Sequence, residues 1–312
     1  MDIWQRGTSI TGSGAYVYNA DRWEGFLAST YSVTRIDVSS LLNNFQYGLR
    51  AQRASGQTTT NYFNIEQGLE TSTIQPLRGN IVTVSFWARC GANFSATSSQ
   101  MGVTLFCGTG TERVRNVTAF TSETTPINTN ATLTTTYQKF TFTSTAVPTT
   151  TTQAALTFSA YPTGTAGAND WFEVTGVQLE IGSVATTFTR AGGTIQGELA
   201  ACERYYQRVN TAGATYAFLG FGTANTTSTG FMMAKLKTTM RKAPTAIGYG
   251  GSLYLTDGPN IYSVSSMSID TGLTNESNLG FIANSSGLTQ FRFHYLRGQA
   301  DASVYLDMTA EL

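Results

Sequence analysis

Apolar and polar residues alternate along most of the chain in short runs, which is the pattern of β-strands that bury one face. The run at residues 81–89 is the clearest example, because every second residue is apolar and these residues share one face of the strand. These side chains belong to Val82, Val84, Phe86 and Ala88. Clusters of Gly, Asn, Pro and Thr separate such runs up to about residue 190. The pattern predicts an antiparallel sandwich of jelly-roll type over residues 1–192.

The same alternation resumes after residue 210 and continues to the end of the chain. In the last run the apolar face consists of Val304, Leu306, Met308 and Ala310. We therefore expect a second β-sandwich over residues 210–312. The fold class expected for the whole chain is all-β.

A different periodicity separates the two predicted sandwiches, in residues 197–209, GELAACERYYQRV. Apolar residues spaced three or four apart form one stripe on an α-helix: Leu199, Cys202, Tyr206 and Val209. Glu198 near the start and Arg208 near the end suit the helix dipole. We expect a short connecting helix within residues 193–209. So short a helix needs a partner, which is either one of the sandwiches or the same helix in neighbouring subunits, with the stripe as the seam of a trimer.

Composition narrows the range of partners. Only 12% of the 312 residues are charged, the formal net charge is zero, and no basic cluster occurs. Nucleic acid and anionic membranes are therefore excluded as partners, because both require a positive surface. No run approaches the roughly 20 apolar residues of a membrane-spanning helix, and the N-terminus lacks the layout of a secretion signal, so we expect synthesis in the cytoplasm. Cys90, Cys107 and Cys202 lack metal-ligand spacing and are expected to be small buried residues rather than disulfide partners.

Motifs of catalysis are missing from the sequence. The single histidine, His294, is expected at a solvent-facing or interface position, without the partners of a general base. Glu173 and Glu180 differ by an odd number of positions and are expected on opposite faces of one strand, which would separate them as a glycosidase pair. We expect no enzymatic activity and no cofactor. A structural Ca²⁺ ion is compatible with a jelly roll, but the sequence assigns no ligands to it.

Sugar binding is the chemistry that this composition favours. Aromatic rings stack on the apolar faces of sugars, and neutral amides and hydroxyls bind the sugar hydroxyls. The candidates are Trp87, on the polar face of its strand, and Tyr249, Tyr254 and Tyr262 in the Gly-rich segment 248–262. Trp87 is alternatively a core residue covered by the other sheet. The three tyrosines are alternatively part of an ordinary turn cluster.

Four segments of the chain carry a resemblance to a known family. They are IWQRGTSI with YNADRWEG near the start, VTGVQLEIGSVATTFTRA at 174–191, GELAACERYYQR at 197–208, and MRKAPTAI at 240–247 with the terminal TAEL. In this order they resemble the virion appendage proteins of tailed bacteriophages, the tail-fibre and head-fibre family with a jelly roll similar to carbohydrate-binding modules. The segment at 174–191 is similar to the closing strand of that jelly roll.

The resemblance implies a structural virion protein, a tail fibre or similar appendage, that attaches the particle to the host surface by glycan recognition. It also implies a homotrimer, which favours the seam interpretation of the helix, with other virion proteins and a host-surface glycan as partners. The C-terminal sandwich would then be a receptor-binding tip. Because the jelly roll follows Met1 almost at once, attachment to the particle would use the jelly roll itself, or the protein decorates another part of the particle. Two alternatives remain: a head-decoration or head-fibre protein with no specific ligand, and a depolymerase of surface polysaccharide.

Overall fold

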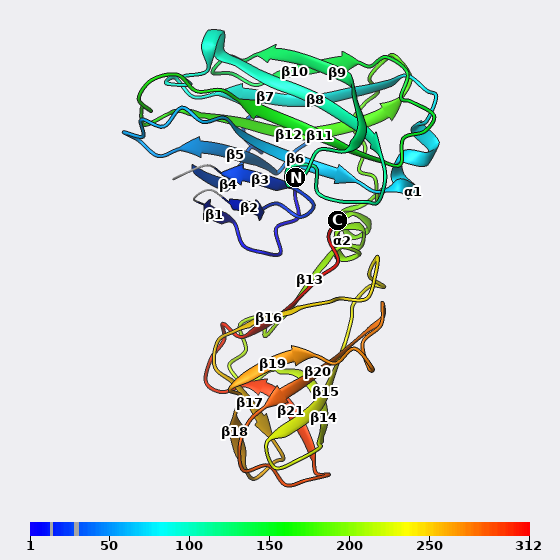
Figure 1. The fold of residues 1–312 in the computed structure, drawn as a ribbon. Helices are drawn as coiled ribbons and strands as arrows, with labels where there is room; N and C mark the ends of the chain where they lie inside the picture. The colour runs from blue at the N-terminus through cyan, green and yellow to red at the C-terminus, as the bar shows by residue number, and fades with distance from the viewer. Residues whose placement is uncertain (13–14, 28–30) are drawn as a thin grey trace. The chain divides into compact units, whose positions relative to one another are not determined.

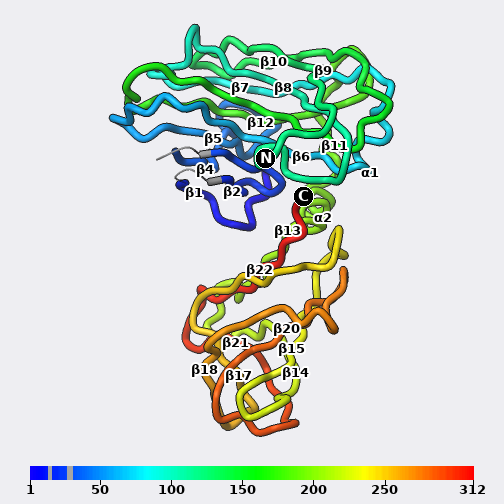
Figure 2. Tube along the Cα trace, in the orientation of Figure 1, coloured from blue at the N-terminus to red at the C-terminus, as the bar shows by residue number. Residues whose placement is uncertain are grey.

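The computed structural model describes residues 1–12, 15–27 and 31–312. The chain forms two compact units, which are described separately below. The N-terminal unit comprises residues 1–193 with Leu312, and the C-terminal unit comprises residues 194–311. Figure 2 follows the chain through the first unit, from blue to green, before it enters the second. Both units are built from β-strands, and the fold is all-β, as predicted.

The N-terminal unit is a sandwich of two six-stranded antiparallel sheets (Figure 1). Sheet A contains, in spatial order, β1 (Ser9–Gly12), β4 (Tyr31–Asp37), β5 (Tyr47–Arg53), β12 (Trp171–Ile181), β7 (Val82–Cys90) and β10 (Gln138–Thr143). Sheet B contains β2 (Ala15–Tyr18), β3 (Glu24–Leu27), β6 (Phe63–Leu69), β11 (Gln153–Ala160), β8 (Gln100–Thr109) and β9 (Thr121–Thr132). Short helical turns occur at α1 (Thr71–Ile74), η1 (Gln75–Leu77) and η2 (Thr97–Ser99).

The inner faces of the two sheets form the core of this sandwich. The alternating face predicted for β7 is fully buried, from Val82 to Ala88. Phe86 of sheet A meets Phe158 of sheet B edge to face, with ring centroids 4.8 Å apart. The odd-numbered residues of β7, including Trp87, must therefore lie on the opposite face of sheet A.

A β-bulge in β12 changes which carboxylates share a face. Thr175 is opposite Trp87 in the register with β7, but Gln178 is opposite Ser85, so β12 carries one extra residue between them. Glu173 and Glu180 are opposite Arg89 and Thr83, two residues of the same parity. The expectation that Glu173 and Glu180 lie on opposite faces is therefore wrong, because strict alternation fails at the bulge.

An ion pair is buried at one end of the N-terminal unit. Arg53 and Asp170 have fully buried side chains, and Nη1 of Arg53 lies 2.8 Å from Oδ2 of Asp170. The guanidinium also donates to the backbone carbonyls of Gln57 and Thr59, at 3.0 and 2.7 Å. Ser95 donates its hydroxyl and its amide to the Asp170 carboxylate. These bonds tie the end of β5 and the residue that precedes β12 to the loops that follow β5 and β7.

The C-terminal unit begins with α2 (Ile195–Glu203) and continues with two antiparallel sheets. The three-stranded sheet contains β13 (Tyr206–Asn210), β22 (Tyr305–Thr309) and β16 (Ile247–Gly250). The seven-stranded sheet contains β18 (Ile261–Ser263), β17 (Leu253–Thr256), β21 (Phe293–Gly298), β14 (Phe218–Ala224), β15 (Thr229–Lys235), β20 (Asn278–Asn284) and β19 (Ser266–Ile269). The face predicted for the last run, from Val304 to Ala310, is buried in the core.

The helix is shorter than the sequence pattern predicts. It starts at a Thr194 cap, whose hydroxyl accepts a hydrogen bond from the Gly197 amide at 3.1 Å, and it ends at Glu203. Tyr206 and Val209 belong instead to β13, which pairs with β22. Aromatic and β-branched residues favour a strand once a partner strand supplies backbone hydrogen bonds. The four residues of the predicted seam therefore do not form one helical stripe.

His294 is buried, so the prediction of a solvent-facing or interface position is wrong. It lies on β21, and its Nδ1 is 2.9 Å from the carbonyl oxygen of Arg292. Phe293 and Tyr295, its neighbours in sequence, are 46% and 43% exposed. The register places His294 and Leu296 on the core face, and alternation then forces the two aromatic rings outward.

Cys90, Cys107 and Cys202 are buried and form no disulfide, as predicted. Burial raises the pKa of the Cys107 thiol to about 12, so this thiol stays protonated at neutral pH. No helix of the described residues is both long enough and apolar enough to cross a membrane.

Candidate functional site

The face of sheet A that points away from the core carries a mixture of aromatic and polar side chains. We call it the outer face of sheet A. It includes Ser85 and Trp87 from β7 and Lys139 from β10, which is opposite Trp87 in the strand register. Trp87 is half-buried. The alternative in which the other sheet covers Trp87 is therefore not what the structure shows.

A cavity of about 330 Å³ lies on this outer face, and we call it the Trp87 cavity. Its lining residues come from three strands of sheet A and from two segments outside the sheet. They are Leu41, Leu42, Asn43, Asn44, Phe45, Ser85, Trp87, Lys139, Gly176, Thr187 and Phe188. The set combines aromatic rings with amides, hydroxyls and one ammonium group. The described residues that line it include no carboxylate.

A small apolar cluster holds the wall of the Trp87 cavity in place. Leu42 and Phe45 are buried in this cluster together with Val38, and Trp87 and Phe188 pack against it. The rings of Phe45 and Phe188 meet edge to face at 4.9 Å. The wall is therefore fixed by side-chain packing between the residue 38–45 loop and the chain after β12.

Gly176 allows Phe45 to approach the sheet. It lies in the bulge of β12 with φ of +60°, a backbone conformation that is unfavourable for residues with a Cβ atom. A Cβ atom at this position would lie 2.5 Å from Cζ of Phe45. The glycine is thus required twice, for the backbone of the bulge and for the space that the ring occupies.

Beside the Trp87 cavity, Glu173 organises a charged network on the same face. Its fully buried carboxylate accepts hydrogen bonds from the guanidinium groups of Arg50 and Arg89, and from the Tyr137 hydroxyl at 2.7 Å. The Arg50 guanidinium also lies 4.2 Å from the ring centroid of Trp171. Burial, together with the nearby Glu173 carboxylate, raises the pKa of Tyr137, so its hydroxyl remains a donor.

These bonds hold the Glu173 carboxylate in place between two guanidinium groups and the Tyr137 hydroxyl. Glu180, on the same face, accepts hydrogen bonds from Gln178 at 2.9 Å and from the hydroxyl of Thr186 at 2.7 Å. Partial burial alone would raise the pKa of Glu180, but these hydrogen bonds outweigh it and lower the pKa. A general acid of glycoside hydrolysis needs the opposite shift.

The structure does not bring the three predicted tyrosines together. Tyr249 lies on β16 of the three-stranded sheet, 38% exposed, and its hydroxyl oxygen accepts a hydrogen bond from the Met267 amide at 3.2 Å. Tyr254 and Tyr262 lie on the paired strands β17 and β18 of the other sheet. Tyr262 is opposite Leu255, so it faces the side of the sheet opposite to Tyr254. It packs edge to face on buried His294, with centroids 5.7 Å apart.

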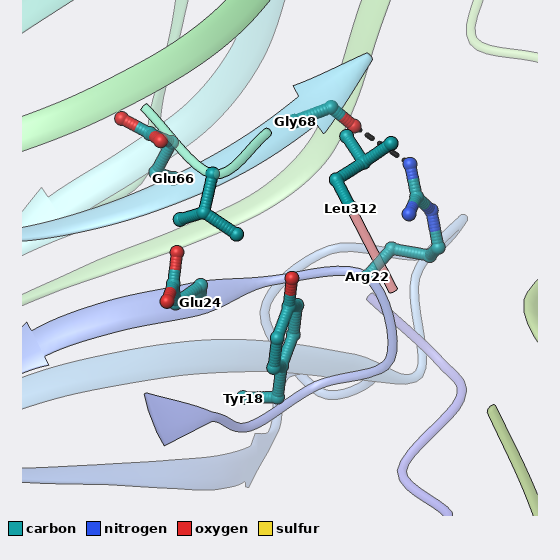
Figure 3. Close-up of a pocket in the computed structure, with 7 residues that line it drawn as sticks. Tyr18, Arg22, Glu24, Glu66, Gly68 and Leu312 are labelled. Carbon is teal, nitrogen blue, oxygen red and sulfur yellow. Dashed lines mark hydrogen bonds between the residues drawn. The ribbon is translucent and has the colours of Figure 1, made fainter. Parts of the chain in front are cut away.

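A second cavity lies in the N-terminal unit, beside the outer face of sheet B, but it is far smaller (Figure 3). Its volume is about 10 Å³, roughly the space of one water molecule. Tyr18, Glu24 and Glu66 line it, and Arg22 donates a hydrogen bond to the Gly68 carbonyl at 2.6 Å beside it. Burial raises the pKa of the Glu66 carboxyl to about 7, although hydrogen bonds from Thr157 and the Asn116 amide oppose the shift.

The described side chains that line these two cavities do not form a metal site. In residues 1–12, 15–27 and 31–312, no three His, Cys, Asp or Glu side chains gather in a way that could hold a metal ion. The side chains that line the Trp87 cavity offer aromatic rings, hydrogen-bonding amides and hydroxyls, and the ammonium group of Lys139.

The sequence pattern predicted Trp87 as a candidate but none of the other residues that line the cavity. The parity of β7 sets Trp87 opposite the apolar face of its strand, but it left open whether the other sheet covers the ring. The Glu173 network was hidden because its members, Arg50, Arg89 and Tyr137, are separated by tens of residues. Asn43 and Asn44 lie in a loop whose path depends on packing of Phe45 rather than on any local pattern.

Comparisons with known proteins give partial likenesses. No family model matches the chain, and no curated protein matches it. Among solved structures, the chain is similar to the enzymatically active domain of tailspike protein 4 of bacteriophage CBA120, with 14% identity and a TM-score of 0.36 over 51% of this chain. That match spans only 19% of the tailspike chain.

Two carbohydrate-binding modules are also similar. One is the CBM22-2 xylan-binding domain of Paenibacillus barcinonensis Xyn10C, with 14% identity, a TM-score of 0.34, and coverage of 53% of this chain and 94% of that one. The other is the C-terminal family 22 module of Clostridium thermocellum Xyn10B, with 13% identity, a TM-score of 0.36, and coverage of 57% and 100%.

Proposed function

We propose that the N-terminal unit binds a glycan in the Trp87 cavity, and that the chain serves as a non-enzymatic attachment protein of a phage particle. The observation that carries the binding proposal is a half-buried tryptophan at a cavity of about 330 Å³, where further apolar side chains lie beside the neutral hydrogen-bonding groups of Asn43, Asn44, Ser85 and Thr187. This volume falls at the lower end of the roughly 300–1,000 Å³ of small-molecule sites. It suits one or two sugar rings.

The residues around Trp87 supply the two kinds of contact that a sugar needs. The indole ring offers an apolar face for the C–H side of a pyranose. Asn43, Asn44 and Thr187 are exposed at the cavity and can exchange hydrogen bonds with sugar hydroxyls. Because the Phe45 wall is already packed, binding costs little ordering of the protein.

Binding without cleavage fits the carboxylates of the outer face. Glu173 is engaged by two arginines and a tyrosine, and Glu180 has a lowered pKa. Retaining and inverting glycosidases both need one carboxyl group with a raised pKa next to the bond that breaks. The proposed role is recognition of a surface polysaccharide rather than its degradation.

The phage assignment is supported by the four sequence segments that resemble tail-fibre and head-fibre proteins. With a glycan-binding N-terminal unit, such a protein would sit on the virion and attach it to the host surface. Immunogold labelling of intact virions with antibody against residues 210–312 tests this part separately. Gold on the tail appendages supports attachment, gold spread over the head supports decoration, and unlabelled particles contradict a virion protein.

A glycan array probed with the purified full-length chain tests the binding proposal. We expect binding to hexose-containing glycans that Trp87→Ala weakens by about 5- to 150-fold, from the loss of roughly 1–3 kcal/mol of ring contact. Asn43→Ala with Asn44→Ala should also weaken binding, and these exposed residues can change without disturbing the packed cluster. Tyr161→Ala is the matched control, because Tyr161 is a 65% exposed aromatic residue of the same unit that does not line the cavity. Binding that survives both cavity variants would contradict the proposed site.

A further inference from the structure

One face of the seven-stranded sheet in the C-terminal unit exposes a contiguous set of aromatic rings. We call it the aromatic face. Its central members are Phe218 (61% exposed), Phe221 (50%), Phe231 (37%), Phe293 (46%) and Tyr295 (43%). They lie on β14, β15 and β21, which are neighbours in the sheet (Figure 1).

The strand register makes these side chains neighbours. Phe221 is opposite Tyr295 on one side and Met233 on the other. The ring of Tyr295 lies 4.8 Å from that of Phe218 and 4.9 Å from that of Phe293. Phe221 and Phe293 stack at 6.2 Å. The rings therefore form one patch rather than scattered exposed residues.

The sequence of these strands shows that both faces of the sheet are apolar. Leu219, Met232 and Leu296 point into the core of the unit, while the aromatic residues next to them in sequence point outward. Near-continuous apolar runs are typical of strands that are covered on both faces. The core of the C-terminal unit covers one face here, whereas within that unit the aromatic face stays exposed.

The area of the patch is close to what association of two proteins requires. A fully exposed aromatic side chain presents about 200 Å². The exposed fractions of the five rings then give roughly 500 Å², and Tyr216 and Phe291 on the adjoining segments, at 50% and 76% exposure, raise the sum to about 700 Å². A standard interface buries about 800 Å² per partner. The five central rings thus lie in the upper part of the roughly 300–600 Å² that the largest apolar patch of a monomer covers, and the two adjoining residues extend the exposed surface beyond it.

The chemistry of the patch favours protein over sugar as the occupant. Four of its five central residues are phenylalanines, which offer no hydrogen bond to a hydroxyl. The rings of Phe293 and Tyr295 are inclined by 83°, and those of Phe218 and Tyr295 by 48°, so they do not form a flat platform for a sugar chain. Interdigitating rings from a second protein would fill such a surface better.

We infer that the aromatic face is covered by a second copy of this chain. The chain has no net charge at pH 7, so two copies meet without electrostatic repulsion. The seam predicted on the helix cannot supply the contact, because Cys202 and Tyr206 are buried within a single chain, with 8% and 4% exposure. Self-association through the aromatic face is independent of glycan binding at Trp87, which lies in the other unit.

Light scattering after size exclusion tests the inference, with the full-length chain at concentrations from roughly 1 to 100 µM, a range that spans moderate and weak affinities. The wild-type chain should elute with a mass of two or more chains. Phe221→Glu and Phe293→Glu should each raise the dissociation constant at least 30-fold, about the effect of truncating a central aromatic anchor. Both side chains are exposed, so circular dichroism should show a folded chain. Tyr161→Glu, at an aromatic residue of the other unit that is still more exposed (65%), should keep the wild-type mass.

Two results would overturn the inference. One is a wild-type chain that remains monomeric over the whole concentration range. The other is an oligomer whose mass neither glutamate variant changes. If the wild-type chain is monomeric and Phe221→Glu abolishes binding on the glycan array, the aromatic face is a sugar platform instead, and the inferred contact between copies is refuted.

Discussion

Replacing Glu66 by Gln should make the N-terminal unit more stable at neutral and alkaline pH. Glu66 is 2% exposed on β6, where its carboxyl accepts hydrogen bonds from the Thr157 hydroxyl at 2.9 Å and the Asn116 amide at 3.2 Å. Burial raises its pKa from 4.5 to about 7. The folded chain therefore binds a proton more tightly at this site than the unfolded chain does.

The sign and the size of the effect follow from this difference. Between pH 4.5 and 7 the folded state holds more protons at Glu66 than the unfolded state, so the contribution of Glu66 to the free energy of unfolding falls as pH rises through that window. A shift of about 2.5 pKa units corresponds to roughly 3 kcal/mol. Gln resembles the protonated acid in shape and hydrogen bonding, so Glu66→Gln should match wild type near pH 4.5 and exceed it by about 3 kcal/mol at pH 8.

Urea unfolding followed by tryptophan fluorescence between about pH 4.5 and pH 8 measures the difference. Glu180→Gln is the control with the opposite sign, because hydrogen bonds lower the pKa of Glu180 and its charged form helps the folded state at neutral pH. If Glu66→Gln and wild type keep a constant separation across this pH range, the raised pKa of Glu66 is refuted. A variant that is less stable than wild type at pH 8 would refute it equally.

Two further substitutions probe the framework around the site. Asp170→Asn should lower the free energy of unfolding by about 3–5 kcal/mol, because it leaves the Arg53 guanidinium buried without its counter-charge; a loss below about 1 kcal/mol in urea unfolding would show that the ion pair contributes little. Gly176→Ala should cost about 2 kcal/mol through its positive φ and the displaced Phe45 ring, and it should weaken glycan binding as well. Unchanged affinity in that variant would show that the Phe45 wall is not part of the site.

Much of the fold follows from alternation alone. The buried faces of β7 and β22 are those that the sequence predicts, because a long strand with one covered face leaves a clear two-residue period. The prediction from alternation fails in two strands, β12 and β21. The bulge at Gly176 reverses the parity of β12, so Glu180 joins the face of Glu173. In β21 both faces are apolar, and parity could not tell which residues face the core; His294 was therefore placed on the wrong side.

The candidate site was predictable only in part, for a similar reason. Trp87 is placed by its strand, whereas the cavity beside it is made by Phe45 and Phe188, two loop residues brought together by packing. The tyrosines of residues 248–262 are near one another in sequence, but the intervening strands β16, β17 and β18 distribute them over two sheets. Proximity in the sequence did not predict proximity in space, because Tyr249 lies in a different sheet and Tyr254 and Tyr262 face opposite sides of theirs.

Fluorine NMR of the full-length chain labelled with 5-fluorotryptophan tests glycan binding at Trp87 most directly. The chain has four tryptophans, and Trp4, Trp23 and Trp171 are only 5–8% exposed, so Trp87 is the residue that a ligand reaches first. Addition of a glycan selected on the array should shift the Trp87 resonance most, with an affinity equal to that from the array. A glycan that binds while the Trp87 resonance stays in place would contradict the proposed site.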